Sequence, residues 1–149
     1  MYAFADKLLE VTERHADEIA AQWCKAVQSN PHTPWFHARR AEDCSNFALE
    51  FYKNFRVVYF DEKPYKKLEK YFADYAEENF RKGVPMEEAI YALIMMRRHI
   101  WLFADFQALF VTALDAHRAV ETLNRTIRVF DQGIFVIIRR YRELEKAKK

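Results

Sequence analysis

Apolar residues recur at intervals of three and four along most of this chain, and such spacing is typical of amphipathic helices. Proline, glycine and polar turn residues cluster at three places that interrupt the pattern. The pattern therefore predicts five helical segments, the first with a break near Arg14 and His15. The segments span residues 3–29, 41–60, 64–82, 85 to a weak break at 112–115, and from that break to about 146. We predict an all-α fold, an antiparallel bundle of about five helices with a long C-terminal helix, in a single domain over residues 1–149.

The junction between the third and fourth segments carries clear stop and start signals. Lys82 and Gly83 end the third segment as a basic last turn followed by a glycine cap. Glu87 and Glu88 open the fourth segment, where the helix dipole favours anions. The fourth segment is apolar around most of its circumference, so we predict that it is the central helix.

The most regular pattern lies in the last segment, where apolar residues follow spacings of four, three, four, three, four and three. An unbroken heptad repeat of this kind predicts a seam that faces another helix along its length. The sequence leaves open whether that helix belongs to a second copy or to the same chain. We predict a homodimer, with an interface formed by the seam residues Leu123, Ile127, Phe130, Ile134, Ile137, Tyr141 and Leu144.

Composition and charge exclude several classes of protein. The 149 residues include two glycines, too few for the many turns of a sheet protein or for a phosphate-binding loop. Lys and Arg number 24 against 22 Asp and Glu, and this balance argues against a nucleic-acid partner. No window approaches the roughly 18 apolar residues of a membrane span, and the charged N-terminal residues are unlike a signal peptide.

The two cysteines indicate the redox environment of the protein. Cys24 and Cys44 lack the CxxC spacing of redox or zinc motifs, which favours free thiols in a reducing environment. We therefore expect a cytoplasmic protein.

The sequence offers no constellation for catalysis or for metal binding. None of the five histidines has Glu three residues before it, as a di-iron bundle would need. No nucleotide-binding, nucleophile-elbow or zinc-protease motif is present. We expect a protein that is not an enzyme, with no catalytic residue, no metal site and no cofactor.

One histidine supports an alternative function. His99 lies in the apolar fourth segment, and a helical bundle lined with aromatic and methionine side chains can hold haem. The more common interpretation is a histidine that is hydrogen-bonded within the fold. The alternative is therefore a haem- or apolar-ligand-binding sensor with a candidate pocket formed by His99, Met95, Trp101, Phe103 and Phe72.

Three further features have two interpretations each. Arg97 and Arg98 are expected to pair with carboxylates of a neighbouring helix, although one could hold a haem propionate. The candidate carboxylates are Asp74, Glu77 and Glu78. The aromatic stripes of the helices are expected to form the core, with an apolar ligand cavity as the alternative. The loop at residues 34–36 is either a lid folded onto the bundle or a partner contact.

The stretch from Arg81 to Ile90, with Leu93, the Arg97–Arg98 pair and the upstream Trp23, resembles the N-terminal domain of RsbT co-antagonist (RsbR/RsbRD-type) proteins and related sensor histidine kinases. The resemblance covers about residues 10–142. It implies an all-helical, partly globin-like sensory domain that dimerises through its terminal helices and usually lacks haem. It also implies a role in bacterial signal transduction and stress response, upstream of a kinase or an anti-sigma regulatory output protein. The chain departs from that arrangement in ending at Lys149 with no output domain.

Overall fold

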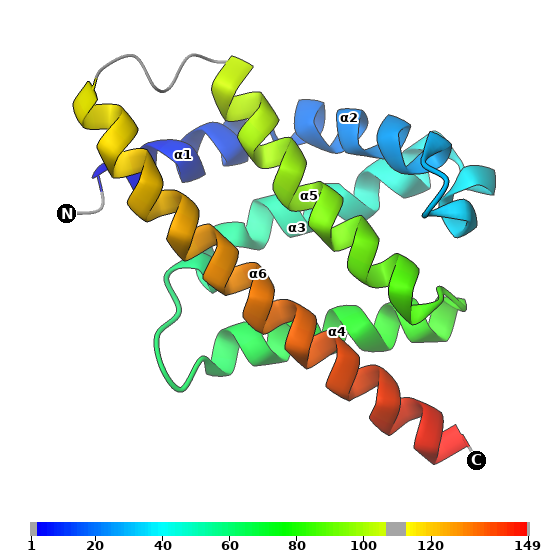
Figure 1. The fold of residues 1–149 in the computed structure, drawn as a ribbon. Coiled ribbons are helices and arrows are strands. Elements are labelled where there is room, and N and C mark those ends of the chain that lie inside the picture. Colours follow the sequence, from blue (N-terminus) through cyan, green and yellow to red (C-terminus); the bar gives the residue numbers. More distant parts are fainter. Residues whose placement is uncertain (1–2, 107–112, 149) are drawn as a thin grey trace.

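The computed structural model describes residues 3–106 and 113–148, with side chains described for residues 6–103 and 120–148. Every regular element in these ranges is helical, which confirms the all-α prediction (Figure 1). The elements are α1 (Ala3–Arg14), α2 (Ala16–Ser29), the short 3₁₀ helix η1 (Pro34–Ala38), α3 (Ala41–Tyr59), α4 (Lys66–Lys82), α5 (Met86–Phe106) and α6 (Ala113–Lys148).

The helices form two groups that pack on each other. The segments α2, α3 and α4 lie behind α5 and α6 in the view of Figure 1, and α6 runs diagonally across α4. The closest packing joins α4 to α6 and α2 to α3, while α5 packs on α2 and on α6. The expected break in the first segment is present, because α1 ends at Arg14 and α2 begins at Ala16.

The core is rich in aromatic side chains, and the polar groups of three of them donate hydrogen bonds to carbonyls of α5. Trp23 Nε1 donates to the carbonyl of Ala92 at 2.9 Å. The hydroxyls of Tyr52 and Tyr75 donate to the carbonyls of Met96 and Ala89, at 2.9 and 2.8 Å. The helices α2, α3 and α4 thus each bind α5 by one buried hydrogen bond. The side of α5 that faces these three helices is therefore central, as predicted.

A glycine permits the close packing of α4 and α6. A Cβ atom added at Gly133 would lie 2.7 Å from the ring of Phe72, which is fully buried. A larger residue can occupy this position only if the buried ring of Phe72 or one of the two helices shifts.

The ends of α4 differ in how well the sequence predicted them. Gly83 caps the helix with φ of 85°, as predicted. The start is two residues later than Pro64, because Tyr65 has a left-handed backbone with φ of 58°. The carboxylate of Asp61 accepts the Leu68 N–H at 2.9 Å and so satisfies the first turn.

None of the helices in the described ranges has the combined length and apolar character needed to cross a membrane. The predicted break at 112–115 lies partly outside the described residues.

Candidate functional site

The C-terminal seam divides into an exposed part and a part covered by the same chain. Leu123 and Ile127 are 39% and 36% exposed, whereas Phe130 and Ile137 are completely buried. Tyr141 is also buried, and its hydroxyl donates to the carbonyl of Val84 at 2.8 Å. Ile134 and Leu144 are half-buried.

This division corrects the prediction of one continuous dimer interface. The ring of Phe130 lies 5.6 Å from that of Phe51 and 5.9 Å from that of Phe55, both on α3. The buried seam residues Phe130, Ile137 and Tyr141 therefore serve the fold of the single chain. At these three positions the seam packs against helices α3 and α4 of the same chain and not against a second copy.

The exposed seam residues continue into an apolar stripe along one side of α6. Leu123, Ile127 and Ile134 are spaced by four and seven residues, which places them on the same side of a helix with 3.6 residues per turn. Val120, one turn before, is 56% exposed. Phe135 is 59% exposed but lies on another side of the helix.

A matching stripe runs along α5. Ile90, Ile94 and Trp101 are half-buried and share one side of the helix with Arg97. The guanidinium of Arg97 lies 5.8 Å from the centroid of the Phe130 ring, so this side of α5 is turned toward α6. We call the two stripes together the α5–α6 face, formed by Ile90, Ile94, Trp101, Leu123, Ile127 and Ile134.

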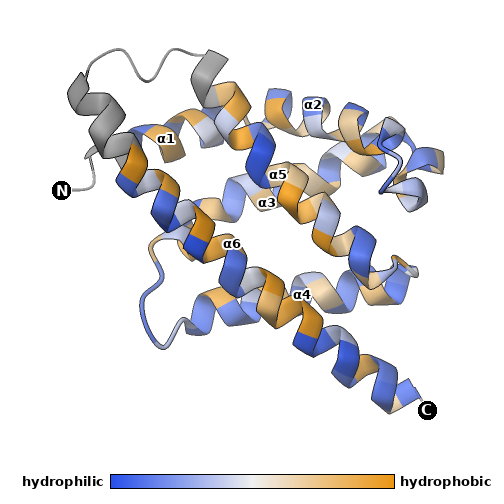
Figure 2. Cartoon of the chain, viewed as in Figure 1, coloured by the Kyte–Doolittle hydropathy of each residue, from blue (hydrophilic) through white to orange (hydrophobic). Residues whose placement is uncertain are grey.

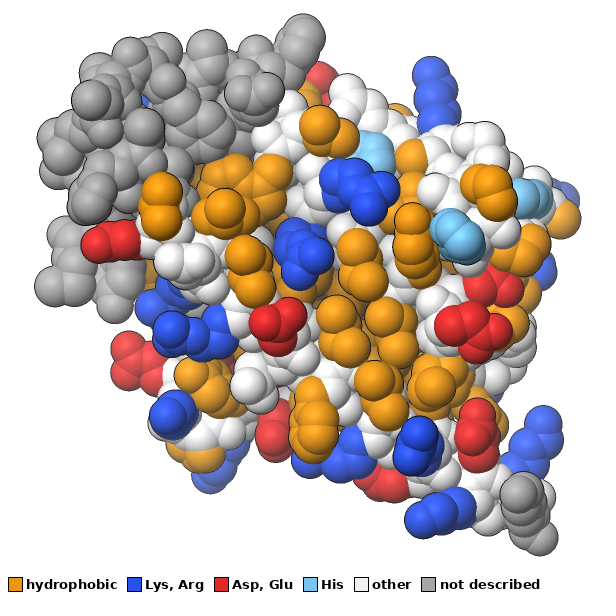
Figure 3. Space-filling model, viewed as in Figure 1, with side chains coloured by type: hydrophobic (Ala, Val, Ile, Leu, Met, Phe, Trp, Pro, Cys, Tyr) orange, Lys and Arg blue, Asp and Glu red, His pale blue; other side chains and the backbone are white. Residues whose placement is uncertain are grey.

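Apolar side chains gather on the surface over α5 and α6 in the space-filling view (Figure 3). The hydropathy view likewise shows apolar positions on the visible sides of both helices (Figure 2). A helix that is apolar around most of its circumference was expected to be central. The structure instead leaves the side of α5 with Ile90, Ile94 and Trp101 only half-buried, and that side adjoins the stripe on α6.

The five residues of the candidate haem pocket do not converge. His99 is half-buried, and its Nδ1 lies 2.8 Å from the carbonyl of Met95 in the same helix. Trp101 is two residues further along, so it projects from the opposite side of α5. Phe103 contacts the ring of His15, with 5.1 Å between centroids. Phe72 is packed against α6 at Gly133. None of the five lines any of three surface pockets found among the described residues.

The expected ion pairs of Arg97 and Arg98 are replaced by others among the described residues. Glu77 pairs with Arg140 of α6, and Glu78 pairs with Lys82 at 3.1 Å. Asp74 pairs with Lys70 at 2.9 Å. The carboxylates of α4 thus bind partners on their own helix or on α6, because α6 and not α5 is their nearest neighbour.

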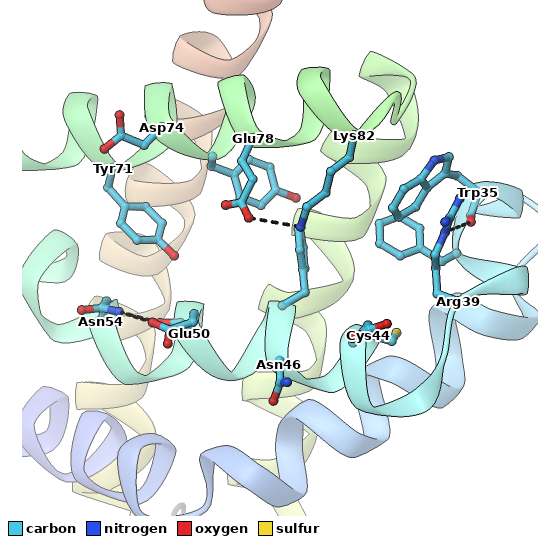
Figure 4. A pocket seen from close by; sticks show the side chains of 14 residues that line it. Trp35, Arg39, Cys44, Asn46, Glu50, Asn54, Tyr71, Asp74, Glu78 and Lys82 are labelled. Carbon is cyan, nitrogen blue, oxygen red and sulfur yellow. Dashed lines mark hydrogen bonds and ion pairs between the residues drawn. The ribbon is translucent and has the colours of Figure 1, made fainter.

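A pocket with a volume of about 860 Å³ lies between α3 and α4 (Figure 4). Sequence reasoning did not find it, since its residues come from segments far apart in the chain. The lining residues from η1 and α3 are Trp35, Phe36, Arg39, Asp43, Cys44, Asn46, Phe47, Glu50 and Asn54. Those from α4 are Tyr71, Asp74, Tyr75, Glu78 and Lys82. The sequence does place aromatic and acidic residues close together at 71–78 of α4.

The loop before α3 closes one end of this pocket. Phe36 is 1% exposed, and its ring meets that of Trp23 edge-on at 5.7 Å. The backbone N–H of Trp35 donates to the carboxylate of Glu88 at 2.7 Å. The loop is therefore a lid packed onto the bundle, one of the two interpretations that the sequence left open.

The two cysteines are free and buried, as expected. Cys24 and Cys44 are neighbours, and the Cys44 thiol lies 3.9 Å from the Cys24 carbonyl. Burial raises the pKa of the Cys44 thiol far above its ordinary value, and the Cys24 side chain adds to that shift. Such a thiol stays protonated and weakly nucleophilic.

Comparisons with known proteins identify no relative of this chain. No protein-family model, no curated protein and no solved structure matches it. Within the described residues, no cluster of three or more His, Cys, Asp or Glu side chains is arranged to hold a metal ion. The function must therefore be argued from the chain's own surfaces.

Proposed function

We propose that this chain is a non-enzymatic sensory or regulatory module of bacterial signal transduction that acts by helix-mediated dimerisation through the α5–α6 face. The observation that carries the proposal is the pair of adjacent apolar stripes on α5 and α6, whose side chains are left exposed or only half-buried by the described helices. The resemblance to sensor domains that dimerise through terminal helices supports the same function.

The physical argument is the cost of leaving this face in water. Leu123, Ile127 and Val120 are each more than one third exposed, and they follow one another along two turns of α6. Burying apolar area is worth about 25 cal/mol per Å², from which the cost of association is subtracted. Contiguous apolar patches of this kind mark interaction sites more often than scattered apolar residues do.

Pairing through these helices supplies a way to transmit a signal. The half of α6 that forms the face continues directly into the half that packs on α4. A shift of one copy against the other therefore changes the position of the C-terminal turns, where an output partner of the kinase or anti-sigma class would read it.

The proposal is tested by the oligomeric state of matched variants. Ile127→Asp places a charge in the proposed interface at a position that is 36% exposed, so the fold should tolerate it. Analytical ultracentrifugation at tens of micromolar should show a dimer for the parent chain and a monomer for the variant.

Phe135→Asp is the matched control. It introduces the same charge on the same helix at a position that is 59% exposed but lies outside the α5–α6 face. The control should remain dimeric. A parent chain that is monomeric, or a control that dissociates as readily as Ile127→Asp, contradicts the proposal.

The haem alternative is tested separately. Titration with haemin should give no Soret band that depends on His99, because the other residues of the candidate pocket do not converge on this histidine. A Soret band that disappears in His99→Ala would establish the alternative and displace the proposal above.

A further inference from the structure

The pocket between α3 and α4 combines aromatic walls with an excess of negative charge. Phe47, Tyr71 and Tyr75 form part of its wall, and the rings of Phe47 and Tyr75 lie 5.5 Å apart. Its charged lining residues are the four carboxylates Asp43, Glu50, Asp74 and Glu78 and the two cations Arg39 and Lys82. The pocket is thus net negative in a chain whose formal net charge is +2.

The carboxylates come from both helices that border the pocket. Asp43 and Glu50 come from α3, whereas Asp74 and Glu78 come from α4 (Figure 4). Between them, Tyr71 extends from α4 toward α3. The pKa of the Tyr71 hydroxyl is raised, first by burial and then by the charges of Glu50 and Glu78. The negative charges around the pocket therefore disfavour a further anion and favour a bound cation.

Two of the chain's own cations already stack on the aromatic residues of this pocket. The guanidinium of Arg39 lies 3.8 Å from the centroid of the Trp35 ring. The Nζ of Lys82 lies 5.6 Å from the centroid of Phe47 and 3.1 Å from the carboxylate of Glu78. The walls thus bind a guanidinium and an ammonium in the geometry of cation–π interactions.

The end of the pocket away from η1 lacks such a resident cation. Glu50 is hydrogen-bonded there by the side chain of Asn54, which carries no charge. Asp74 pairs with Lys70, and both side chains are more than half exposed, as is that of Glu78, so water screens these charges. The volume of about 860 Å³ lies within the range of roughly 300–1,000 Å³ found for small-molecule sites.

We propose that this pocket binds a small organic cation, with an ammonium or guanidinium group between Glu50 and Glu78 and an apolar body against Phe47 and Tyr71. Lys82 occupies part of the same site and competes with the ligand. The inference stands whether or not the chain dimerises, and it assigns the pocket to a free small molecule rather than to a side chain of a protein partner.

The test compares three probes of nearly equal shape and different charge. Phenethylammonium carries a positive charge, phenylethanol is neutral and phenylacetate is negative. Isothermal titration calorimetry on the full chain should show binding of the cation, at least about tenfold weaker binding of the alcohol, and none of the anion. Equal affinity for the cation and the alcohol, or no binding of the cation at millimolar concentration, overturns the proposal.

Two variants assign the binding to this pocket. Glu50→Gln removes one charge with little change of shape and should weaken binding of phenethylammonium about fivefold while leaving the alcohol unaffected. Lys82→Met keeps the aliphatic stem and removes the competing ammonium, so the cation should bind several-fold more tightly. Weaker binding in Lys82→Met would show that Lys82 supports the site rather than competing for it, and that result overturns the assignment.

Controls separate this proposal from its alternatives. Glu10→Gln on α1 removes an exposed carboxylate outside the pocket and should leave affinity unchanged. A lysine-rich peptide tests the other source of ammonium groups, and tighter binding of the peptide than of phenethylammonium contradicts assignment to a free small molecule. The oligomeric state is recorded for each variant, so failure of the dimer and failure of the pocket give different results.

Discussion

At the scale of single residues, packing between α4 and α6 depends on the missing side chain of Gly133. The ring of Phe72 fills the space that a Cβ atom would take, at 2.7 Å. The sequence alone does not explain this glycine, because glycine is ordinarily unfavourable in the middle of a helix. Only the neighbouring helix explains it.

Gly133→Ala should destabilise the chain even though alanine is the better helix former. Overpacking costs about 1–3 kcal/mol, which exceeds the roughly 1 kcal/mol that alanine contributes to helix propensity. Urea unfolding followed by circular dichroism measures the difference. The double variant Gly133→Ala with Phe72→Leu should be less destabilised than the sum of the two single variants. Exact additivity would contradict the proposed contact.

Glu88 offers a second test at this scale. Glu87 and Glu88 both lie in the first turn of α5, and removing either loses the same interaction with the helix dipole. Glu88 also accepts the N–H of Trp35, and it is only 7% exposed. Glu88→Ala should therefore cost about 1–3 kcal/mol more than Glu87→Ala. Urea unfolding of both variants measures this, and equal stabilities would show that the bond to the lid contributes nothing.

At the scale of elements, α6 shows how much a periodic pattern determines. The heptad spacing predicted correctly that this segment is one long helix with an apolar side. It did not predict that one part of this side would pack on α4 of the same chain while another part would stay exposed. A spacing of three and four is the same whether the facing helix is the chain's own or a partner's.

Charge substitution along α6 should reveal this division. Ile137→Asp buries a carboxylate at a position with 0% exposure and should cost several kcal/mol or prevent folding. Ile127→Asp, at 36% exposure, should leave the thermal unfolding of the monomer nearly unchanged. Melting curves recorded at low protein concentration make the comparison. Similar losses in both variants would mean that α6 is covered along its full length.

At the scale of the whole molecule, buried tyrosines should make the fold sensitive to alkali. Burial raises the pKa of Tyr52 and Tyr75 well above the ordinary value, and it also raises the pKa of Tyr71 and Tyr141. Above pH of about 10 the unfolded chain loses tyrosine protons that the folded chain retains. The unfolded state then binds fewer protons, so the free energy of unfolding falls as pH rises.

We expect each such tyrosine to contribute a loss of up to about 1.4 kcal/mol per pH unit above that point. The part of the tyrosinate absorbance that comes from these four residues should rise together with the loss of far-ultraviolet circular dichroism. Tyr75→Phe should make the fall with pH less steep. A parent and a Tyr75→Phe variant that differ in tyrosinate absorbance near pH 10, while the helical signal of both is intact, would contradict the burial of the Tyr75 hydroxyl.

The candidate sites also differ in how far they could be predicted. The α5–α6 face includes Leu123 and Ile127, which the heptad repeat identified, but its α5 half was assigned to the core. The pocket near His99 was not formed, because His99 and Trp101 are two positions apart on a helix and project from opposite sides. The α3–α4 pocket joins residues 35–54 with 71–82, and no local spacing relates those segments.

Local spacing by itself determined that the chain is helical, where most helices begin and end, and which residues have an apolar side. These properties depend on neighbours within about one turn, such as the glycine cap at Gly83, and they are therefore present in the order of residues. The tertiary structure decided which apolar side is covered, which carboxylates face one pocket, and why Gly133 is small. Those properties depend on contacts between residues distant in the chain, and the periodicity of a single helix is the same whatever packs against it.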